Sequence, residues 1–315
     1  MKTKKQSFIY IVTILLLLDG CKPGIRPEIA MLADSIAGAG VVHKGLIGAF
    51  PSSYTSDQFL RFVSLADNST TSELQQLSNH ANSIVRYYAL SALSYREDEN
   101  VLFMLADHLT DTAEIKSLGF DIMTRAPLSS IVAREFMERY FKKMPLNKLN
   151  YQKVRSLALD PIVPSALVML ARFKKPQDKE MLKQRIWELI FMLKVLPNDA
   201  SPYYPLYGLA AIRDYPDSIF YPILKECADS MIVGRKIPRN MLFQAIVQYQ
   251  TDSSLTLLRR AFDYSNQQDD YRAQADLAVA LIKYPDHIFQ HEFADKVKLN
   301  FKTVAMWYRW SKEEL

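Results

Sequence analysis

The clearest regular pattern of apolar and polar positions lies within residues 72–109. Apolar side chains recur at helical spacing over residues 83–93, at positions 84, 85, 88, 89, 92 and 93. Asn82 or Ser83 precedes this stripe and is suited to cap the first turn, where backbone N–H groups have no partner inside the helix. A second apolar stripe follows an acidic turn and covers residues 101–109. The pattern therefore predicts two antiparallel helices joined by a polar turn.

A turn of similar composition recurs along the chain. In each copy a helical pattern ends near an aromatic residue, a turn with Pro or Asp follows, and a second apolar pattern begins, because Pro cannot continue a helix and Asp can cap the next one. The copies begin at Tyr95, Phe173, Tyr215, Tyr249 and Tyr284, with a weaker one at Arg125-Ala126-Pro127. The last three are 34 and 35 residues apart. This recurrence predicts stacked helical hairpins, and the alternative is an irregular bundle of helices.

The run from Asn82 to Leu90, together with Ala92 and Leu93, resembles a HEAT or armadillo-type repeat. That resemblance implies an all-α fold, an α-solenoid of stacked antiparallel helical hairpins in which each hairpin buries its apolar face against its neighbours. We expect this array over residues 53–315, with a first helix near residues 56–66. The aromatic segment 301–310 is expected to be a C-terminal capping helix, or alternatively an exposed patch for a partner.

The N-terminus has the pattern of a secretory signal. Three lysines precede an apolar stretch at residues 8–18, which is shorter than the ~20 residues that a transmembrane helix needs. The following Leu18-Asp19-Gly20-Cys21 resembles a bacterial lipobox, which implies that residues 1–20 are removed and that Cys21 carries a lipid. The alternatives are an uncleaved signal anchor and an ordinary secretory signal. Residues 21–52 contain Gly, Pro and only a short helical pattern at 27–36, so we expect a tether.

The resemblance to a lipoprotein signal also predicts a location. Lys22, rather than Asp, follows Cys21, and the lipoprotein sorting rule then implies transfer to the outer membrane, with the periplasmic and surface-exposed orientations both open. After lipidation of Cys21, Cys227 is the only other cysteine, so no intrachain disulfide is available. Cys227 lies in an apolar helical pattern and is expected to be a small buried side chain.

The net charge of the chain excludes few classes of function, but the charged residues are distributed unevenly along the sequence. Residues 1–20 hold three of the 39 basic and one of the 34 acidic side chains, so the remaining chain carries a net charge of +3. This near-neutral value and the predicted export argue against a nucleic-acid partner. Residues 34–114 hold four basic and ten acidic side chains, whereas residues 134–185 hold thirteen basic and five acidic ones.

The basic segment contains a candidate binding patch made of Lys142, Lys143, Lys174 and Lys175, which lie near predicted helix ends. Such a patch is suited to an acidic protein, a polyanionic glycan or lipid headgroups. The alternative is a set of solvated helix faces whose Lys stems cover apolar surface. Tyr203, Tyr204 and Tyr207 are expected to line a groove or, alternatively, to pack between repeats.

The search for catalytic motifs finds no phosphate-binding loop, dinucleotide fingerprint or nucleophile elbow, and predicts no cofactor. His287 and His291 are four residues apart, but Ile288 stands where a metalloprotease helix needs Glu, so we expect no metal site. The carboxylates of Asp269, Asp270 and Asp276 have no evident base or metal beside them in the sequence.

The sequence therefore predicts a non-enzymatic protein-binding or scaffold lipoprotein of the bacterial cell envelope, held to the membrane by its N-terminal lipid and bound to an envelope protein. A narrower version is a toxin immunity lipoprotein. The alternative from another class is an envelope enzyme that acts on glycan or lipid through residues brought together by the fold.

Overall fold

A computed structural model describes residues 24–47, 53–120, 122–195, 203–232, 239–268, 270, 273, 274, 276, 277 and 280. The protein is mostly helical, and the chain divides into two compact units, Met1–Tyr140 and Phe141–Leu315. We refer to them as unit 1 and unit 2. Cys21, the His287–Glu292 segment, the turn at Tyr284 and the expected capping helix at 301–310 all lie outside the described residues. Among the described residues, no helix combines the length and apolarity needed to cross a membrane.

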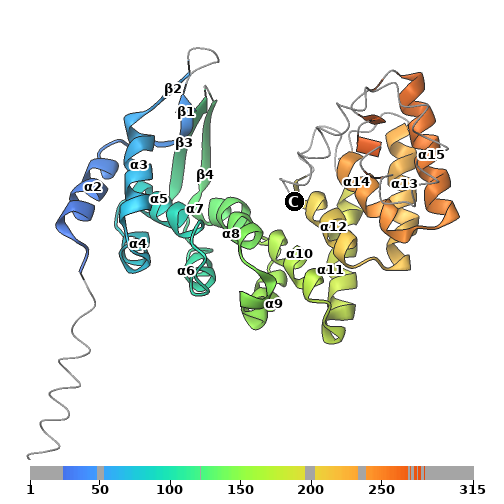
Figure 1. The fold of residues 1–315 in the computed structure, drawn as a ribbon, viewed down its shortest axis with the longest axis horizontal. Helices are drawn as coiled ribbons and strands as arrows, with labels where there is room; N and C mark the ends of the chain where they lie inside the picture. The colour runs from blue at the N-terminus through green and yellow to red at the C-terminus, as the bar shows by residue number, and fades with distance from the viewer. Residues whose placement is uncertain are drawn as a thin grey trace, which may run out of the picture. The chain divides into compact units, whose positions relative to one another are not determined.

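Unit 1 combines helices with a small sheet, which the expected all-α fold did not include (Figure 1). Its strand order is β2-β1-β3-β4, with β1 and β3 parallel and the two outer pairs antiparallel. The strands are β1 (Val42–Ile47), β2 (Tyr54–Thr55), β3 (Glu114–Phe120) and β4 (Ile122–Pro127). The weak turn copy at residues 125–127 is therefore part of a strand instead of a helix–helix turn.

Side chains in the first half of β3 alternate between exposed and buried positions, which is the pattern of a strand with one buried face. Ile115 and Ser117 are buried, whereas Glu114 and Lys116 are exposed, as the two faces of a half-buried strand require. Strand β1 joins the same core through Val42 and Ile47. A prediction based on helical periodicity did not identify this two-residue alternation in burial.

Helix α5 is the central element of unit 1. The helices of this part of the chain run as far as α8, which crosses the unit boundary at Tyr140. Their bounds are α2 (Pro27–Ala37), α3 (Asp57–Asn68), α4 (Thr71–Ser78), α5 (Ser83–Leu93), α6 (Val101–Ala106) and α7 (Leu128–Ile131), with a π-helical turn at Val132–Phe136 leading into α8 (Met137–Lys143). The expected cap at Asn82 is confirmed, since its side chain accepts a hydrogen bond from the Ile84 N–H at 2.9 Å. Ser56 caps α3 in the same way, through a hydrogen bond from the Phe59 N–H at 3.1 Å.

The packing of α5 differs from that of a repeat hairpin. Every residue from Ile84 to Leu93 except Arg86 is buried, so the helix is covered on all sides instead of along one stripe. It packs against α2, α3, α4 and β3, and the close helix pair that was expected of α5 and α6 is formed instead by α4 and α5. Tyr88 links α5 to β1, because its hydroxyl accepts a hydrogen bond from the His43 N–H at 2.7 Å.

Residues 27–47, which were expected to lie in a tether, belong to the packed structure of unit 1. Ile29, Ala33 and Ile36 of α2 are buried, and β1 is one of the two inner strands of the sheet. The predicted short helix at residues 27–36 is confirmed, but it is part of the core.

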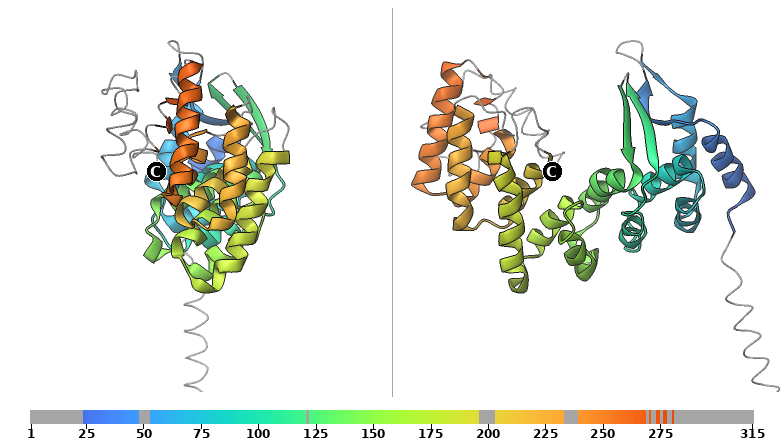
Figure 2. Two further views of the ribbon diagram at one scale, coloured as in Figure 1. Left: turned by 90° about the vertical axis from the view of Figure 1, so that its right-hand side faces the viewer. Right: turned by 180° about the vertical axis from the view of Figure 1, so that it is seen from behind.

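Every regular element in the described residues of unit 2 is a helix. Its helices are α9 (Tyr151–Ala158), α10 (Pro164–Phe173), α11 (Lys179–Val195), α12 (Tyr203–Asp214), α13 (Tyr221–Ile232), α14 (Arg239–Ile246) and α15 (Asp252–Gln267), with short 3₁₀ turns at Leu146–Lys148, Pro176–Asp178, Ser218–Phe220 and Val247–Tyr249. Helix α12 packs against α10, α11 and α14, and α13 lies alongside α14 and α15 (Figures 1 and 2).

The three expected turns of unit 2 that lie within the described residues each join consecutive helices. They follow Phe173, precede α13 at residues 215–217, and precede α15 at residues 249–252. Lys174 and Gln250 end their helical segments with φ of 52° and 46°, the left-handed conformation that often terminates a helix. Cys227 is buried in α13, as expected.

Candidate functional site

Two of the recurring turns of unit 2 line a pocket of about 360 Å³. One wall is the turn between α10 and α11, and the other is the end of α12 with the residues after it. The lining residues are Lys174, Lys175, Pro176, Lys179, Asp214, Tyr215 and Pro216. Because the three lysines are exposed and only one carboxylate lines the same pocket, the pocket has an excess of positive charge.

The lysine-bearing wall is anchored to α9 through Asp178. The side chain of Asp178 is fully buried and accepts hydrogen bonds from the Tyr151 hydroxyl at 2.6 Å and from Arg155 Nε at 2.7 Å. The ammonium group of Lys175 lies 5.9 Å from the centre of the Tyr151 ring, within cation–π range. Burial, followed by the bond to Asp178, raises the pKa of Tyr151, so this hydroxyl stays protonated.

The opposite wall is fixed by Asp217. Its carboxylate accepts a hydrogen bond from the Ile219 N–H at 3.1 Å and pairs with Lys183 Nζ at 3.0 Å, so it ties the turn after α12 to α11. Burial opposes ionisation of Asp217, but the Ile219 N–H and Lys183 together hold its pKa below the usual range. The adjoining Tyr215 lines the pocket, and burial followed by the charge of Asp217 raises its pKa.

None of the three pocket lysines forms an ion pair within 4 Å among the described residues, although the charge of Lys179 helps to lower the pKa of Asp217. Within the described part of the chain, the ion pairs of this region are Arg155–Asp178, Lys183–Asp217, Arg185–Glu188 and Arg213–Asp214, and none includes Lys174, Lys175 or Lys179. Three exposed ammonium groups without such partners are able to donate hydrogen bonds to carboxylate or phosphate oxygens. The arrangement is suited to binding an anion and has no nucleophile paired with a base.

The structure separates the four lysines of the expected patch into two pairs. Lys174 and Lys175 line the pocket together, whereas Lys142 and Lys143 are exposed in the last turn of α8 and do not contribute to its lining. Lys179 joins the pocket pair, because Pro176–Asp178 forms a 3₁₀ turn that brings the start of α11 back beside the turn. The sequence could have indicated that Lys179 belongs to this group, because it lies close to Lys174 and Lys175 in the chain.

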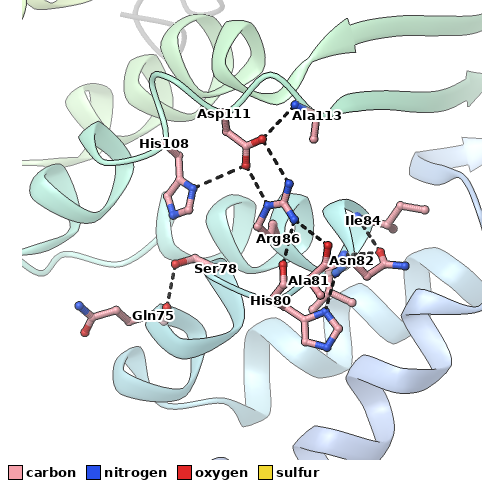
Figure 3. A network of polar contacts seen from close by, with 11 residues as sticks. Gln75, Ser78, His80, Ala81, Asn82, Ile84, Arg86, His108, Asp111 and Ala113 are labelled. Atoms are coloured by element: carbon pink, nitrogen blue, oxygen red, sulfur yellow. Dashed lines mark hydrogen bonds and ion pairs between the residues drawn. The ribbon is translucent and has the colours of Figure 1, made fainter.

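A second polar cluster lies in unit 1 and has the residue types of a catalytic site (Figure 3). Arg86 Nε and Nη2 bind the two oxygens of Asp111 at 2.8 and 3.2 Å, and His108 Nδ1 lies 3.8 Å from Asp111 Oδ2. Arg86 also donates to the carbonyl oxygens of His80 and Ala81, both at 2.9 Å. These contacts hold the segment before β3 against the start of α5.

The geometry of this cluster is that of a structural contact. Burial lowers the pKa of His108, so the imidazole is neutral near pH 7, and Arg86 occupies both oxygens of the carboxylate. Ser78 appears near His108 in Figure 3, but its hydroxyl donates to the Gln75 carbonyl oxygen at 2.8 Å. No element of the cluster is therefore arranged as a nucleophile activated by a base.

Asp270 is one of the carboxylates considered for an envelope enzyme, and the structure describes its contacts. Asp270 pairs with Arg239 and accepts a hydrogen bond from the Ala273 N–H at 2.9 Å, which is a capping role. Asp269 lies outside the described residues, as do the side chains of Tyr203 and Tyr204. Among the residues that the structure describes, no three His, Cys, Asp or Glu side chains are grouped to hold a metal ion.

Comparison with known proteins gives no family for this chain. No protein-family model matches it, and no match was found among curated proteins or solved structures.

Proposed function

We propose that this protein is a non-enzymatic binding lipoprotein of the bacterial cell envelope, which uses the basic pocket of unit 2 to hold an acidic envelope protein. The observation that carries this proposal is the grouping of Lys174, Lys175 and Lys179 in one pocket with a single carboxylate. Lysines without close ion-pair partners attract an acidic surface over a distance of about a Debye length, ~8 Å at physiological ionic strength.

The helices of unit 2 are proposed to form a short HEAT-like array. Support comes from the turns, which recur in sequence and also interact: the Tyr249 hydroxyl, in one turn, donates to the Asp217 carbonyl oxygen of the preceding turn at 2.8 Å. The rings of Tyr249 and Tyr221 pack edge to face at 5.3 Å. In a repeat array each unit interacts mainly with its neighbours, which is the pattern of these contacts.

The anchor of the proposed lipoprotein is a lipid on Cys21, with Lys22 favouring the outer membrane. Two or three acyl chains are sufficient for stable anchoring, because each buried methylene contributes ~0.8 kcal/mol. Replacement of Cys21 by Ser is expected to move the protein from the membrane fraction to the soluble fraction. Persistence of the Cys21→Ser variant in the membrane fraction would contradict the lipid anchor.

The role of the pocket in binding is tested by comparing two pairs of adjacent lysines, both of which the sequence placed in the candidate basic patch. Envelopes are crosslinked in cells that express the wild type, Lys174→Gln/Lys175→Gln or Lys142→Gln/Lys143→Gln, and the captured proteins are quantified. Both variants lose two positive charges from exposed positions, so general charge effects are matched.

We expect the pocket variant to lose at least one specific acidic partner that the wild type and the α8 variant both retain. Binding of that purified partner should weaken as salt rises, since the contact is ionic. Equal capture by all three proteins would overturn the assignment of the pocket. A partner lost only from the Lys142→Gln/Lys143→Gln variant would move the binding surface to α8.

A further inference from the structure

Arg26, five residues after the proposed lipid attachment site, is held by a buried carboxylate of unit 1. Its backbone N–H donates to Glu73 Oε1 at 3.1 Å, and its guanidinium donates to Oε1 at 2.8 Å and to Oε2 at 3.0 Å. Glu73 is only 4% exposed and also accepts a hydrogen bond from the Thr70 N–H at 2.8 Å. The charge-assisted, two-oxygen contact fixes Arg26 to the start of α4.

The chain stays attached to unit 1 immediately after this contact. Helix α2 follows Arg26 and buries Ile29, Ala33 and Ile36 against α3 and α5. Its end is also held, because the Gln58 side chain donates to the Ile36 carbonyl oxygen at 3.2 Å and the Asn82 side chain donates to that of Ala37 at 3.3 Å. The chain between Arg26 and the end of α2 is therefore packed against unit 1 and adds no length to the tether.

This arrangement changes the length of chain between the lipid and the folded protein. A tether over residues 21–52 would span up to ~110 Å, whereas the five residues from Cys21 to Arg26 reach at most ~18 Å, at 3.3–3.6 Å per residue. The difference decides whether unit 1 explores the periplasmic space or stays beside the bilayer.

We propose that the Arg26–Glu73 contact holds unit 1 at the membrane surface, with the start of α2 as its nearest element to the lipid headgroups. The inference depends on the lipid on Cys21 that was proposed above. The exposed face of α2 carries Met31, which is 71% exposed, between the acidic Glu28 and Asp34. These carboxylates disfavour adhesion to anionic headgroups. The short connection, and not an affinity for lipid, therefore keeps this surface at the bilayer, and the distance should follow the length of the connection.

The test uses a chemical anchor, so it does not depend on lipidation in cells. Residues 21–315 with Cys227→Ala are coupled through the Cys21 thiol to a maleimide-headgroup phospholipid in vesicles. A fluorescent amino acid replaces the exposed Met31, and short-range energy transfer to acceptor-labelled headgroups is measured. A second protein carries twenty Gly and Ser residues between Lys22 and Pro23, and a control carries the same twenty residues at its C-terminus.

We expect strong transfer for the parent and the C-terminal control, and a several-fold loss for the protein with the inserted linker, which adds ~25 Å of root-mean-square reach. Equal transfer for the parent and the linker variant would overturn the inference, as would a parent signal no higher than that of uncoupled protein. If Cys21→Ser leaves the protein on cell membranes, the anchor proposal fails, and the vesicle result can still be interpreted by itself.

Discussion

Unit 1 and unit 2 follow the same local rules for helices but are organised differently. In unit 1 a fully surrounded helix, α5, lies against a four-stranded sheet, and the described residues of unit 2 are helices linked by recurring turns. The acidic segment 34–114 lies wholly in unit 1, and most of the basic segment 134–185 lies in unit 2. The comparison shows that the most regular helical stripe in the sequence marked a central core helix of unit 1, and that three of the recurring turns join consecutive helices of unit 2.

The largest expected effect comes from removing a buried side chain in each unit separately. Leu90 in α5 and Leu224 in α13 are both fully buried, so Leu90→Ala and Leu224→Ala should each cost about 2–5 kcal/mol. If the two units are separate folding units, calorimetry should show two transitions, with each substitution lowering only one of them. A single transition lowered equally by both substitutions would indicate one cooperative structure and remove the distinction between the units.

Unit 2 depends on a close approach of α11 to α12 at Gly208. A Cβ added at Gly208 would lie 2.9 Å from the side chains of both Leu189 and Ile190, closer than packed atoms allow. We expect Gly208→Ala to destabilise unit 2 by about 1–3 kcal/mol, measured by urea unfolding. The control is Gly24→Ala in unit 1, where nothing lies within 4 Å of the added atom. Unchanged stability of Gly208→Ala would mean that the two helices are less tightly packed than described.

Unit 1 should show an acid sensitivity that comes from Glu73. The Arg26 side chain, opposed by burial and assisted by the Thr70 N–H, holds the pKa of Glu73 well below its ordinary value of 4.5. A lowered folded-state pKa adds stability above the unfolded-state value, and this stability is lost as the pH falls through 4.5 toward the folded-state value. Unfolding measured from pH 7 to pH 3 should therefore show Glu73→Gln as less stable at pH 7, with a difference that shrinks in acid. A difference that stays constant with pH would contradict the role of the charge.

The smallest expected effect tests the contact between successive turns of unit 2. Tyr249→Phe removes one hydrogen bond to the Asp217 carbonyl oxygen and should cost about 0.5–1.5 kcal/mol in urea unfolding. Tyr54→Phe is the matched control, because Tyr54 is 59% exposed and its loss of a hydroxyl should change little. Equal stabilities for the two variants would show that this contact does not couple the turns.

The sequence predicted local features of the fold well where the signal and its structural consequence lie within a few residues. The cap at Asn82 acts on N–H groups two and three residues away, and the turns after Phe173 and Tyr249 end helical segments at the next residue. It failed for the sheet, because the alternation over Glu114–Ser117 is one of burial and includes the polar Ser117 on the buried face. Strand β3 pairs with β1, which lies some 70 residues earlier in the chain, and no local pattern in the sequence indicates that pairing.

For the candidate site, too, the sequence identified individual residues but not how distant segments bring them together. Lys174 and Lys175 were evident as a basic pair, but their association with Lys179, Asp214 and Tyr215 depends on how α10, α11 and α12 pack. Lys142 and Lys143 had the same composition and helix-end position, and packing left them outside the pocket. Charge density along a chain therefore identifies basic segments without identifying which side chains share a surface.

The sequence by itself determined the cap at Asn82, the turns after Phe173 and Tyr249, which segments are acidic or basic, and that Cys21 follows a short apolar stretch. The tertiary structure alone decided that α5 is central, that residues 27–47 belong to the core, and that Arg26 reaches Glu73. The physical reason is the range of the interactions. Caps and turns satisfy backbone groups within one helical turn, whereas strand pairing, burial on all sides and the Arg26–Glu73 contact require partners tens of residues away, which only the folded chain brings together.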